Sequence, residues 1–254
     1  MESYRLTISD WSAFSPDRVS RADWRRWADG ESAVAADAPA RAELPWVSAM
    51  LRRRLSPMGK AALWAAGQLL SQDRPQPLAT VFASRHGEVA RTVKLLRDLA
   101  DDAPLSPASF SLSVHNAIGG IHSIASDVVT PITAISAGPD TLSAALLEAY
   151  TQLSVTGTGG EVLVVYYDDP LPAPLDGFDG SSPQVQALAM RVSISADGMP
   201  LSFSLTGAGD TLSAGPGPEA DCFLRFLLRD DQSELTVAGD NRRWRWYKQS
   251  QGGA

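Results

Sequence analysis

The chain has 254 residues, of which 44% are hydrophobic and 20% are charged, and its formal net charge is -7. A chain of this length can bury a substantial core, either as one large domain or as two smaller ones. The excess of acidic side chains excludes an overall basic field, so broad binding of nucleic acid or of an anionic membrane is not expected. The single cysteine, Cys222, excludes an intramolecular disulfide framework, and with three histidines the chain offers little for a metal site, so no metal or other cofactor is predicted.

The sequence shows no recognisable signal for secretion or for membrane insertion. The N-terminus lacks the basic region, long apolar core and small-residue cleavage site of a signal peptide. No stretch reaches the roughly 18 uninterrupted apolar residues that a membrane span requires. Together with the single cysteine, these observations predict a soluble, cytoplasmic protein.

The first third of the chain reads as a strand, a loop and a long helix. Residues 4–9 predict a short strand, and the aromatic and arginine side chains of residues 11–27 predict rings packed beneath arginine stems rather than a base-stacking surface. Residues 31–43 predict a loop, and apolar spacings of three and four over residues 45–69 predict one long helix. This helix contains Arg52-Arg53-Arg54. Three successive side chains on a helix spread over about 200° around its axis, so they cannot form one basic face. Ion pairs with a partner or within the chain are therefore favoured over a nucleic-acid-binding patch.

The middle third alternates strands and helices. Residues 78–84 predict a buried strand that ends at a polar turn with His86, either an acid or base or, as we favour, a surface or capping histidine. Residues 89–100 predict an amphipathic helix, and the apolar stretch 106–124 predicts a second one. Gly119 and Gly120 inside this second helix lower its stability by up to about 2 kcal/mol relative to alanine. Glycine at such positions usually allows another backbone to approach closely, which compensates for the loss. His115 and His122 would then lie two turns apart on one face, too far apart to share a metal.

The remaining elements complete the predicted fold class. Residues 131–136 predict a buried strand, and residues 141–153 predict a helix for which Asp140 is the N-cap. Residues 161–167 predict the strongest strand of the chain. The Asp168-Asp169 pair that follows this strand is interpreted as turn-forming rather than as an acid and base or as cation ligands. Residues 186–195 and 201–205 predict a hairpin around Asp197-Gly198, followed by a helix over 220–228 and a last strand over 242–248. The pattern favours an α/β fold with a mostly parallel central sheet covered by helices on both faces.

Motifs for chemistry are scarce. The sequence has no phosphate loop, dinucleotide fingerprint, paired-histidine metal motif or Gly-x-Ser-x-Gly elbow. Asp221 beside Cys222 would raise the pKa of the thiol, so we predict an inert cysteine. One alternative is an independent acyltransferase or hydrolase that pairs Ser136 or Ser143 with His86 or His115. Another is a plain α/β scaffold for some other complex.

Four segments resemble a known family. Residues 106–124, Ser-Pro-Ala-Ser-Phe-Ser-Leu-Ser-Val-His-Asn-Ala-Ile-Gly-Gly-Ile-His-Ser-Ile, resemble β-ketoacyl synthases at their subunit interface, and in particular the short chain length factors of aryl polyene gene clusters. The tryptophan-rich residues 24–27, the Leu-Arg-Arg-Arg-Leu-Ser of residues 51–56 and the Val-Val-Tyr-Tyr-Asp-Asp-Pro-Leu-Pro of residues 164–172 agree with it. The resemblance is clearest over residues 1–180.

This resemblance implies a thiolase-like, layered α/β fold: a single ketosynthase-like domain over residues 1–254 with a shortened C-terminal portion, residues 181–254. The nucleophilic cysteine of active relatives would fall near residues 137–142, where this chain has Asp140, Thr141 and Leu142. Their catalytic histidines lie in the second half, and residues 181–254 contain no histidine. The resemblance therefore implies a chain with no catalytic residue that heterodimerises with an active ketosynthase and helps to shape the tunnel for a chain bound to an acyl carrier protein.

The same resemblance suggests which residues meet the partner subunit. The interface prediction covers Phe110, Ser113, His115, Asn116, Gly119, Gly120 and Ser123. The small residues among them would let a partner approach closely, and the polar ones could form hydrogen bonds across the interface. On this basis, leucine at position 119 or 120 is predicted to break the heterodimer.

Overall fold

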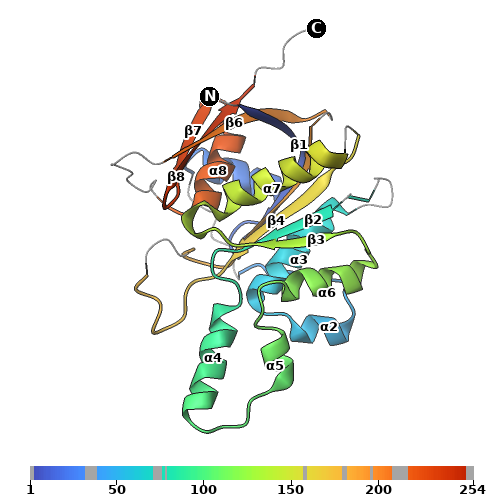
Figure 1. Cartoon of the computed structure of the whole chain (residues 1–254), viewed down its shortest axis with the longest axis vertical. Coiled ribbons are helices and arrows are strands. Elements are labelled where there is room, and N and C mark those ends of the chain that lie inside the picture. Colours follow the sequence, from blue (N-terminus) through green and yellow to red (C-terminus); the bar gives the residue numbers. More distant parts are fainter. Residues whose placement is uncertain are drawn as a thin grey trace.

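The computed structural model describes residues 3–31, 39–70, 76–77, 79–156, 159–178, 182–194, 197–207 and 217–249. Over this part of the chain the strands form one eight-stranded sheet in the order β3-β2-β4-β5-β1-β6-β8-β7 (Figure 1). The strands are β1 (Tyr4–Phe14), β2 (Ala79–Ala83), β3 (Ile132–Ile135), β4 (Val162–Asp168), β5 (Gln186–Ser193), β6 (Met199–Gly207), β7 (Glu234–Ala238) and β8 (Arg242–Lys248). The helices are α1 (Arg21–Ala28), α2 (Ala49–Arg54), α3 (Pro57–Leu69), α4 (Val89–Ala100), α5 (Pro107–Ser111), α6 (Ala117–Ser126), α7 (Thr141–Thr156) and α8 (Glu219–Leu228).

The sheet is mixed, and the expectation of a mostly parallel sheet is wrong. Only two pairings, β2 with β3 and β2 with β4, are parallel. The remaining five pairings, which join β4 to β5 and then run through β1, β6, β8 and β7, are antiparallel. The prediction of a parallel sheet rested on continuous apolar strands such as β4 and β5. These two strands are buried along their whole length because helices cover both of their faces, and not because they are parallel.

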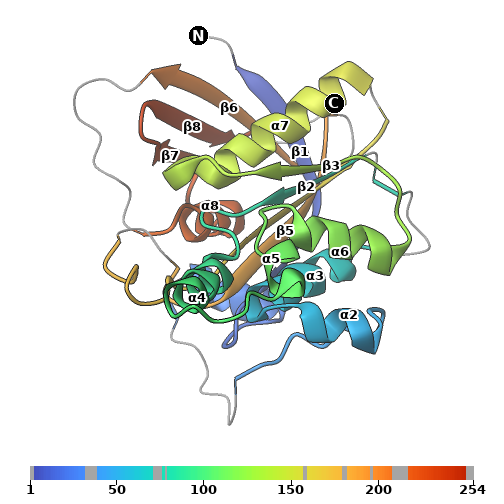
Figure 2. The same cartoon turned by 60° about the horizontal axis from the view of Figure 1, so that its bottom comes forward.

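Two apolar clusters fill the two sides of the sheet. Helices α7 and α8 pack on one face, where α7 lies over β2, β4 and β5, and Trp244 and Trp246 of β8 are fully buried in the same apolar cluster. Helix α3 covers the other face, over β4 and β5. Figure 2 shows α7 and α3 on opposite sides of the central strands. In the described part of the chain, no helix combines the length and the apolar character needed to cross a membrane.

Two predicted helices are each divided in the structure. The long helix expected over residues 45–69 is split into α2 and α3, because Pro57 occupies the first turn of α3 and the Ser56 hydroxyl accepts a hydrogen bond from the Gly59 amide. The stretch 106–124 is divided into α5 and α6 by a turn that carries His115. His115 and His122 therefore do not share a helical face. Most of the predicted loop at 31–43 falls on residues 32–38, outside the described residues.

The predicted hairpin around Asp197-Gly198 is also wrong, because β1 lies between its two strands. Thr7 of β1 pairs with Ser193 of β5 on one side and with Pro200 of β6 on the other. The connection passes so close to β1 that a Cβ atom on Gly198, whose φ is +151°, would lie 2.4 Å from the Ile8 carbonyl oxygen. Glycine at position 198 therefore serves a close backbone approach rather than a two-residue turn.

Helices α4 and α5 extend away from the sheet as an arm (Figure 1). The amphipathic pattern of α4 is present as predicted, but only Val93 of this helix is buried. Leu96 and Leu99 of α4 and Phe110 of α5 are 59%, 58% and 65% exposed. Strand β3, expected to be buried, is half-buried because it is the edge strand of the sheet. The apolar side chains of α4 predicted that this helix would be covered, but Leu96 and Leu99 are exposed to solvent in the single chain.

Candidate functional site at the start of helix α7

The predicted nucleophile position lies where β3 leads into α7. A short 3-10 turn over Gly138–Asp140 connects the two elements. Asp140, Thr141 and Leu142 are all buried, and the Leu142 side chain belongs to the apolar core between the sheet and α7. The Leu142 side chain is therefore part of the packing, and the Thr141 hydroxyl donates its hydrogen bond to the Gly138 carbonyl at 2.8 Å.

A carboxylate from a distant part of the sequence occupies the start of α7. The Glu219 carboxylate, at the beginning of α8, accepts hydrogen bonds from the backbone amides of Leu142, at 2.7 Å, and Ser143, at 2.8 Å. Backbone amides at a helix start carry partial positive charge and lack partners within the helix, so an anion is stabilised there. Burial, assisted by the charge of Asp140, still raises the pKa of Glu219 to about 7.

Asp140 forms a second buried carboxylate beside Glu219. Trp244 Nε1 of β8 donates a hydrogen bond to Asp140 Oδ2 at 2.7 Å, and Arg242 Nε lies 3.2 Å from the same oxygen. A Cβ atom on Gly239 would come within 2.5 Å of the Asp140 carboxylate, so the β7–β8 turn lies directly against it. The start of α7 is consequently closed by β7, β8 and α8.

The arrangement leaves this position without the means for nucleophilic catalysis. The two amides that could stabilise a thiolate or an oxyanion already bind Glu219, and the side chains around them are buried. The family resemblance predicted a site at Asp140, Thr141 and Leu142, but the sequence gave no sign of Glu219, Arg242 or Trp244. A glutamate in the first turn of α8 is an ordinary helix-start residue, and its partners lie 76 and 77 positions away.

The serine and histidine residues of the hydrolase alternative are not brought together. Ser136 Oγ donates to the Arg85 carbonyl at 2.9 Å, while Ser143 Oγ accepts from Trp246 Nε1 at 3.1 Å. His115 Nε2 lies 3.1 Å from the Ile135 carbonyl, and burial lowers the pKa of His86. Within the described residues none of these serines is hydrogen-bonded to a histidine, so the structure offers no activated serine.

The other titratable residues singled out from the sequence have structural roles. Asp168 ends β4 in a buried position, where its carboxylate accepts hydrogen bonds from Ser84 Oγ at 3.0 Å and Tyr166 Oη at 2.6 Å. Burial raises the pKa of Asp168, and the residue links the ends of β2 and β4 instead of forming a turn. Cys222 is half-buried, and burial together with Asp221 raises the pKa of its thiol, as the prediction of an inert cysteine requires.

The seven residues of the predicted interface have different surroundings. Phe110, Asn116 and Gly120 are exposed on the α5–α6 side of the molecule. Ser113 and Ser123 donate to the carbonyl groups of Phe110 and Val128, and His115 contacts the end of β3, so these three bind within the chain. Gly119 is buried against the sheet, where a Cβ atom would lie 2.9 Å from Ile132 Cγ2. The close approach inferred for Gly119 is therefore a contact between α6 and β3 of the same chain.

The sheet with α7 enclosed on one face and α3 on the other defines a thiolase-like α/β protein. Residues 24–247 match the family model described as β-ketoacyl synthase, N-terminal domain, and the chain belongs to this family. The resemblance found in the sequence is thereby confirmed.

Solved structures agree with this assignment, whereas no curated protein matches the chain. A chain in the structure of a ketosynthase (ApeO) in complex with its chain length factor (ApeC) from Xenorhabdus doucetiae is 29% identical, with a TM-score of 0.79; the match covers 95% of this chain and 98% of that one. A β-ketoacyl synthase from Burkholderia phymatum is 14% identical, with a TM-score of 0.58, and covers 82% of this chain and 65% of its own. The ishigamide ketosynthase/chain length factor is 12% identical, with a TM-score of 0.52, and covers 76% of this chain and 59% of its own.

Proposed function

We propose that this chain is a non-catalytic chain length factor that binds an active β-ketoacyl-[acyl carrier protein] synthase. The observation that carries the proposal is the start of α7, where Leu142 is buried and Glu219 holds the amides that a nucleophile would need. A family member closed at this position can contribute through binding and shape rather than through condensation chemistry. The likeness to a chain of a complex between a ketosynthase and its chain length factor supports the same role.

The proposed partner surface combines the β3 edge, the exposed side of α6 and the α4–α5 arm. Within the described residues β3 pairs only with β2, which leaves one side of its backbone available for another chain. Gly120 and Ile124 lie four positions apart on the exposed side of α6, and Val129 follows it at 95% exposure. Phe110 is exposed as well, and exposed apolar side chains of this kind are typical of a surface that meets an obligate partner.

The proposal extends to the substrate of the complex. An acyl carrier protein would deliver the growing chain, as an acyl-carrier protein is found in complex with its ketosynthase in the AntDE:AntF structure. The arm would then help to bound the acyl tunnel of the catalytic subunit. The sequence resemblance further supports aryl polyene elongation and a single ketosynthase-like domain, and the single cysteine supports a cytoplasmic location.

Aspartate at positions 110 and 124 should separate the two subunits. A double variant Phe110→Asp/Ile124→Asp places two charges on the proposed surface, and we expect at least a 10-fold loss of affinity for the ketosynthase, measured by co-purification and by mass photometry of dilutions. The control Val155→Asp adds one charge in place of an 83% exposed valine near the C-terminal end of α7. Unchanged affinity in the double variant, with the chain still folded by circular dichroism, would count against this surface.

The activity itself is tested by separating the subunits. Elongation of a carrier-bound substrate should require the ketosynthase and should rise, or change in product length, when this chain is added. This chain alone should elongate nothing. Elongation by this chain alone would overturn the proposal.

A further inference from the structure

The α4–α5 arm is joined to the rest of the molecule by little apolar packing. Val93 is the only buried residue of α4, and α5 has no buried residue. An arm held only by such contacts would sample several positions, and a partner that binds one of them would have to offset the conformational freedom that is lost. Polar contacts at the root of the arm therefore decide where it lies.

Two residues at the start of α4 provide these contacts. Glu88 is the N-cap residue of the helix and is buried. Its Oε1 accepts a hydrogen bond from Ser56 Oγ at 2.5 Å, and Arg91 Nε lies 3.5 Å from its Oε2. Arg91 Nη2 also donates to the Arg54 carbonyl at 3.2 Å. We call Ser56, Glu88 and Arg91 the root clip, which joins α4 to the junction between α2 and α3.

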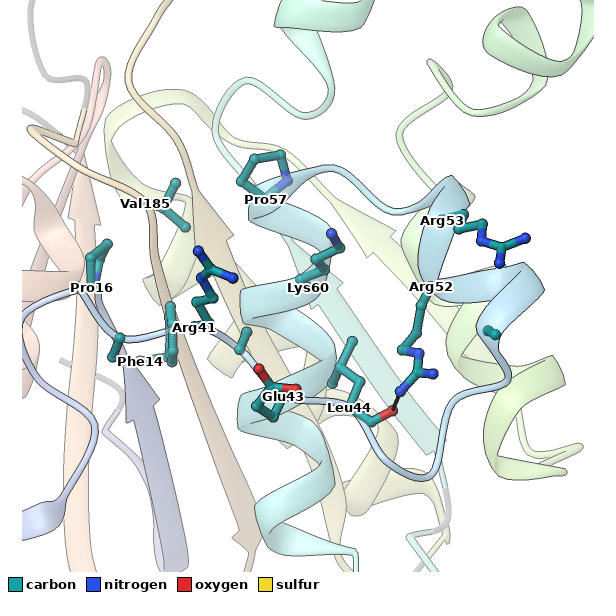
Figure 3. A pocket seen from close by; sticks show the side chains of 13 residues that line it. Phe14, Pro16, Arg41, Glu43, Leu44, Arg52, Arg53, Pro57, Lys60 and Val185 are labelled. Carbon is teal, nitrogen blue, oxygen red and sulfur yellow. Dashed lines mark hydrogen bonds between the residues drawn. The ribbon is translucent and has the colours of Figure 1, made fainter. Parts of the chain in front are cut away.

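The junction between α2 and α3 is itself fixed to the body of the molecule. Leu55 is buried in the apolar cluster on the α3 face, and the Ser56 hydroxyl accepts a second hydrogen bond from the Gly59 amide at 3.0 Å. Figure 3 shows Arg52 of α2, whose Nη1 donates to the Leu44 carbonyl at 3.1 Å. The root clip therefore ties the arm to an anchor that belongs to the core.

The surroundings of the root clip make its ion pair stronger than an ordinary surface contact. The side chains of Arg91 and Glu88 are only 21% and 7% exposed. Burial, together with the nearby charges of Glu88 and Asp168, raises the pKa of Asp169 to about 6, so other carboxylates lie close to Glu88. Without Arg91, the Glu88 carboxylate would remain buried among like charges, which costs more than the loss of an exposed pair.

We infer that Glu88 is a positioning residue that holds the α4–α5 arm, through Ser56 and Arg91, in the position that the partner subunit binds. The inference rests on the proposed function, under which the arm belongs to the surface that meets the ketosynthase. Without the root clip the arm would occupy this position for only part of the time, and the apparent affinity would fall in proportion. Farther along α4, Arg97 Nη2 donates to the Ala173 carbonyl at 2.5 Å, so loss of the clip should loosen the arm without detaching it.

Hydrogen exchange of the full-length chain tests the root clip directly. Glu88→Gln and Arg91→Gln each remove one charge of the ion pair, and amide exchange of α4 should rise at least 10-fold in both variants. Exchange of β4 reports global unfolding in the same samples and should not change. The matched control Arg26→Gln also removes an arginine charge and breaks an ion pair with the residue three positions earlier, Asp23 of α1, and should change α4 exchange less than 2-fold. The double variant Glu88→Gln/Arg91→Gln should exchange little faster than either single variant, because both changes break the same pair.

Affinity for the ketosynthase connects the root clip to assembly. Mass photometry of dilutions should show at least a 3-fold loss of affinity in Glu88→Gln and in Arg91→Gln, and less than a 1.5-fold change in Arg26→Gln. Glu88 is buried within this chain and does not reach a partner. Similar losses in the two clip variants would therefore distinguish positioning of the arm from direct contact between Arg91 and the ketosynthase.

The outcomes separate the inference from the proposed function. Unchanged exchange of α4 in both clip variants overturns the inference, and so does an equal rise in β4, which would mean global destabilisation. A loss of affinity in Arg91→Gln alone would assign Arg91 to direct contact and also overturn it. Faster exchange of α4 with unchanged affinity overturns the positioning role and leaves the heterodimer proposal in place. Failure of the unaltered chain to bind the ketosynthase would instead contradict the proposed function.

Discussion

Leucine in place of Gly119 should lower the free energy of unfolding by about 2–3 kcal/mol, whereas leucine in place of the adjacent Gly120 should not lower it. A Cβ atom at position 119 would already lie 2.9 Å from Ile132 Cγ2 and 3.2 Å from Phe82 Cδ2, and a leucine side chain must force α6 away from the sheet. At position 120 a Cβ atom has nothing within 4 Å, so the change gains about 0.8 kcal/mol of helix propensity without a clash.

Urea denaturation of the isolated chain, followed by circular dichroism, measures this contrast. Equal stability of the two variants would contradict the packing of α6 against β3. The pair also separates folding from assembly, because Gly120→Leu leaves the chain intact and enlarges only the exposed side of α6. If that side meets the ketosynthase, the Gly120→Leu chain should be stable and yet fail to co-purify with it.

Alanine in place of Glu219 should lower the free energy of unfolding by about 2–6 kcal/mol. The change leaves the buried amides of Leu142 and Ser143 without acceptors, and each unpaired buried donor costs about 1–3 kcal/mol. Glutamine keeps one acceptor and should cost less. Chemical denaturation of the three chains at one pH gives the order, with the alanine variant lowest. A Glu219→Ala chain as stable as the unaltered one would contradict the closure of α7 by this carboxylate.

The pH dependence of the Glu219→Gln variant provides an independent measurement. The folded-state pKa of Glu219, about 7, lies above the ordinary value of 4.5, so the folded chain retains a proton that the unfolded chain releases. Stability from this group is fully present below pH 4.5 and is lost as the pH rises toward 7, so the advantage of the unaltered chain over Glu219→Gln should shrink by about 2 kcal/mol from pH 5 to pH 8. His122, whose pKa burial lowers to about 4, acts in the opposite direction but is present in both chains and cancels. A constant difference between the two chains would contradict a buried, titrating Glu219.

Elements with a strong local pattern could be predicted from the sequence, and those that depend on distant pairing could not. Strands β2 and β4 and helices α4, α7 and α8 lie within a few residues of their predicted positions. The division between α2 and α3 was also readable, because Ser56-Pro57 is a cap followed by a first-turn proline. The prediction failed there by giving more weight to apolar periodicity than to the helix-start signal.

The errors in sheet topology have a different origin. Residues 186–207 contain two strands and an Asp-Gly pair, which is the local pattern of a hairpin, and nothing nearby reveals that β1 inserts between them. The same limit applies to the site. Family resemblance predicted a site at the start of α7, but the residues that close this helix start, Glu219, Arg242 and Trp244, come from elements that assemble only in the finished fold.

The insertion of β1 also determines when the chain can fold during synthesis. Thr7 is synthesised long before its two strand partners, Ser193 and Pro200. At a synthesis rate of about 5–20 residues per second, these partners follow β1 after roughly 10–40 s. During this time Leu6, Ile8 and Trp11, which belong to the core of the finished fold, have no strand partner. The β3 edge is synthesised much earlier, but the sheet behind it stays incomplete until β5 and β6 close around β1. Pairing with another subunit through that edge should therefore follow translation of this chain rather than accompany it.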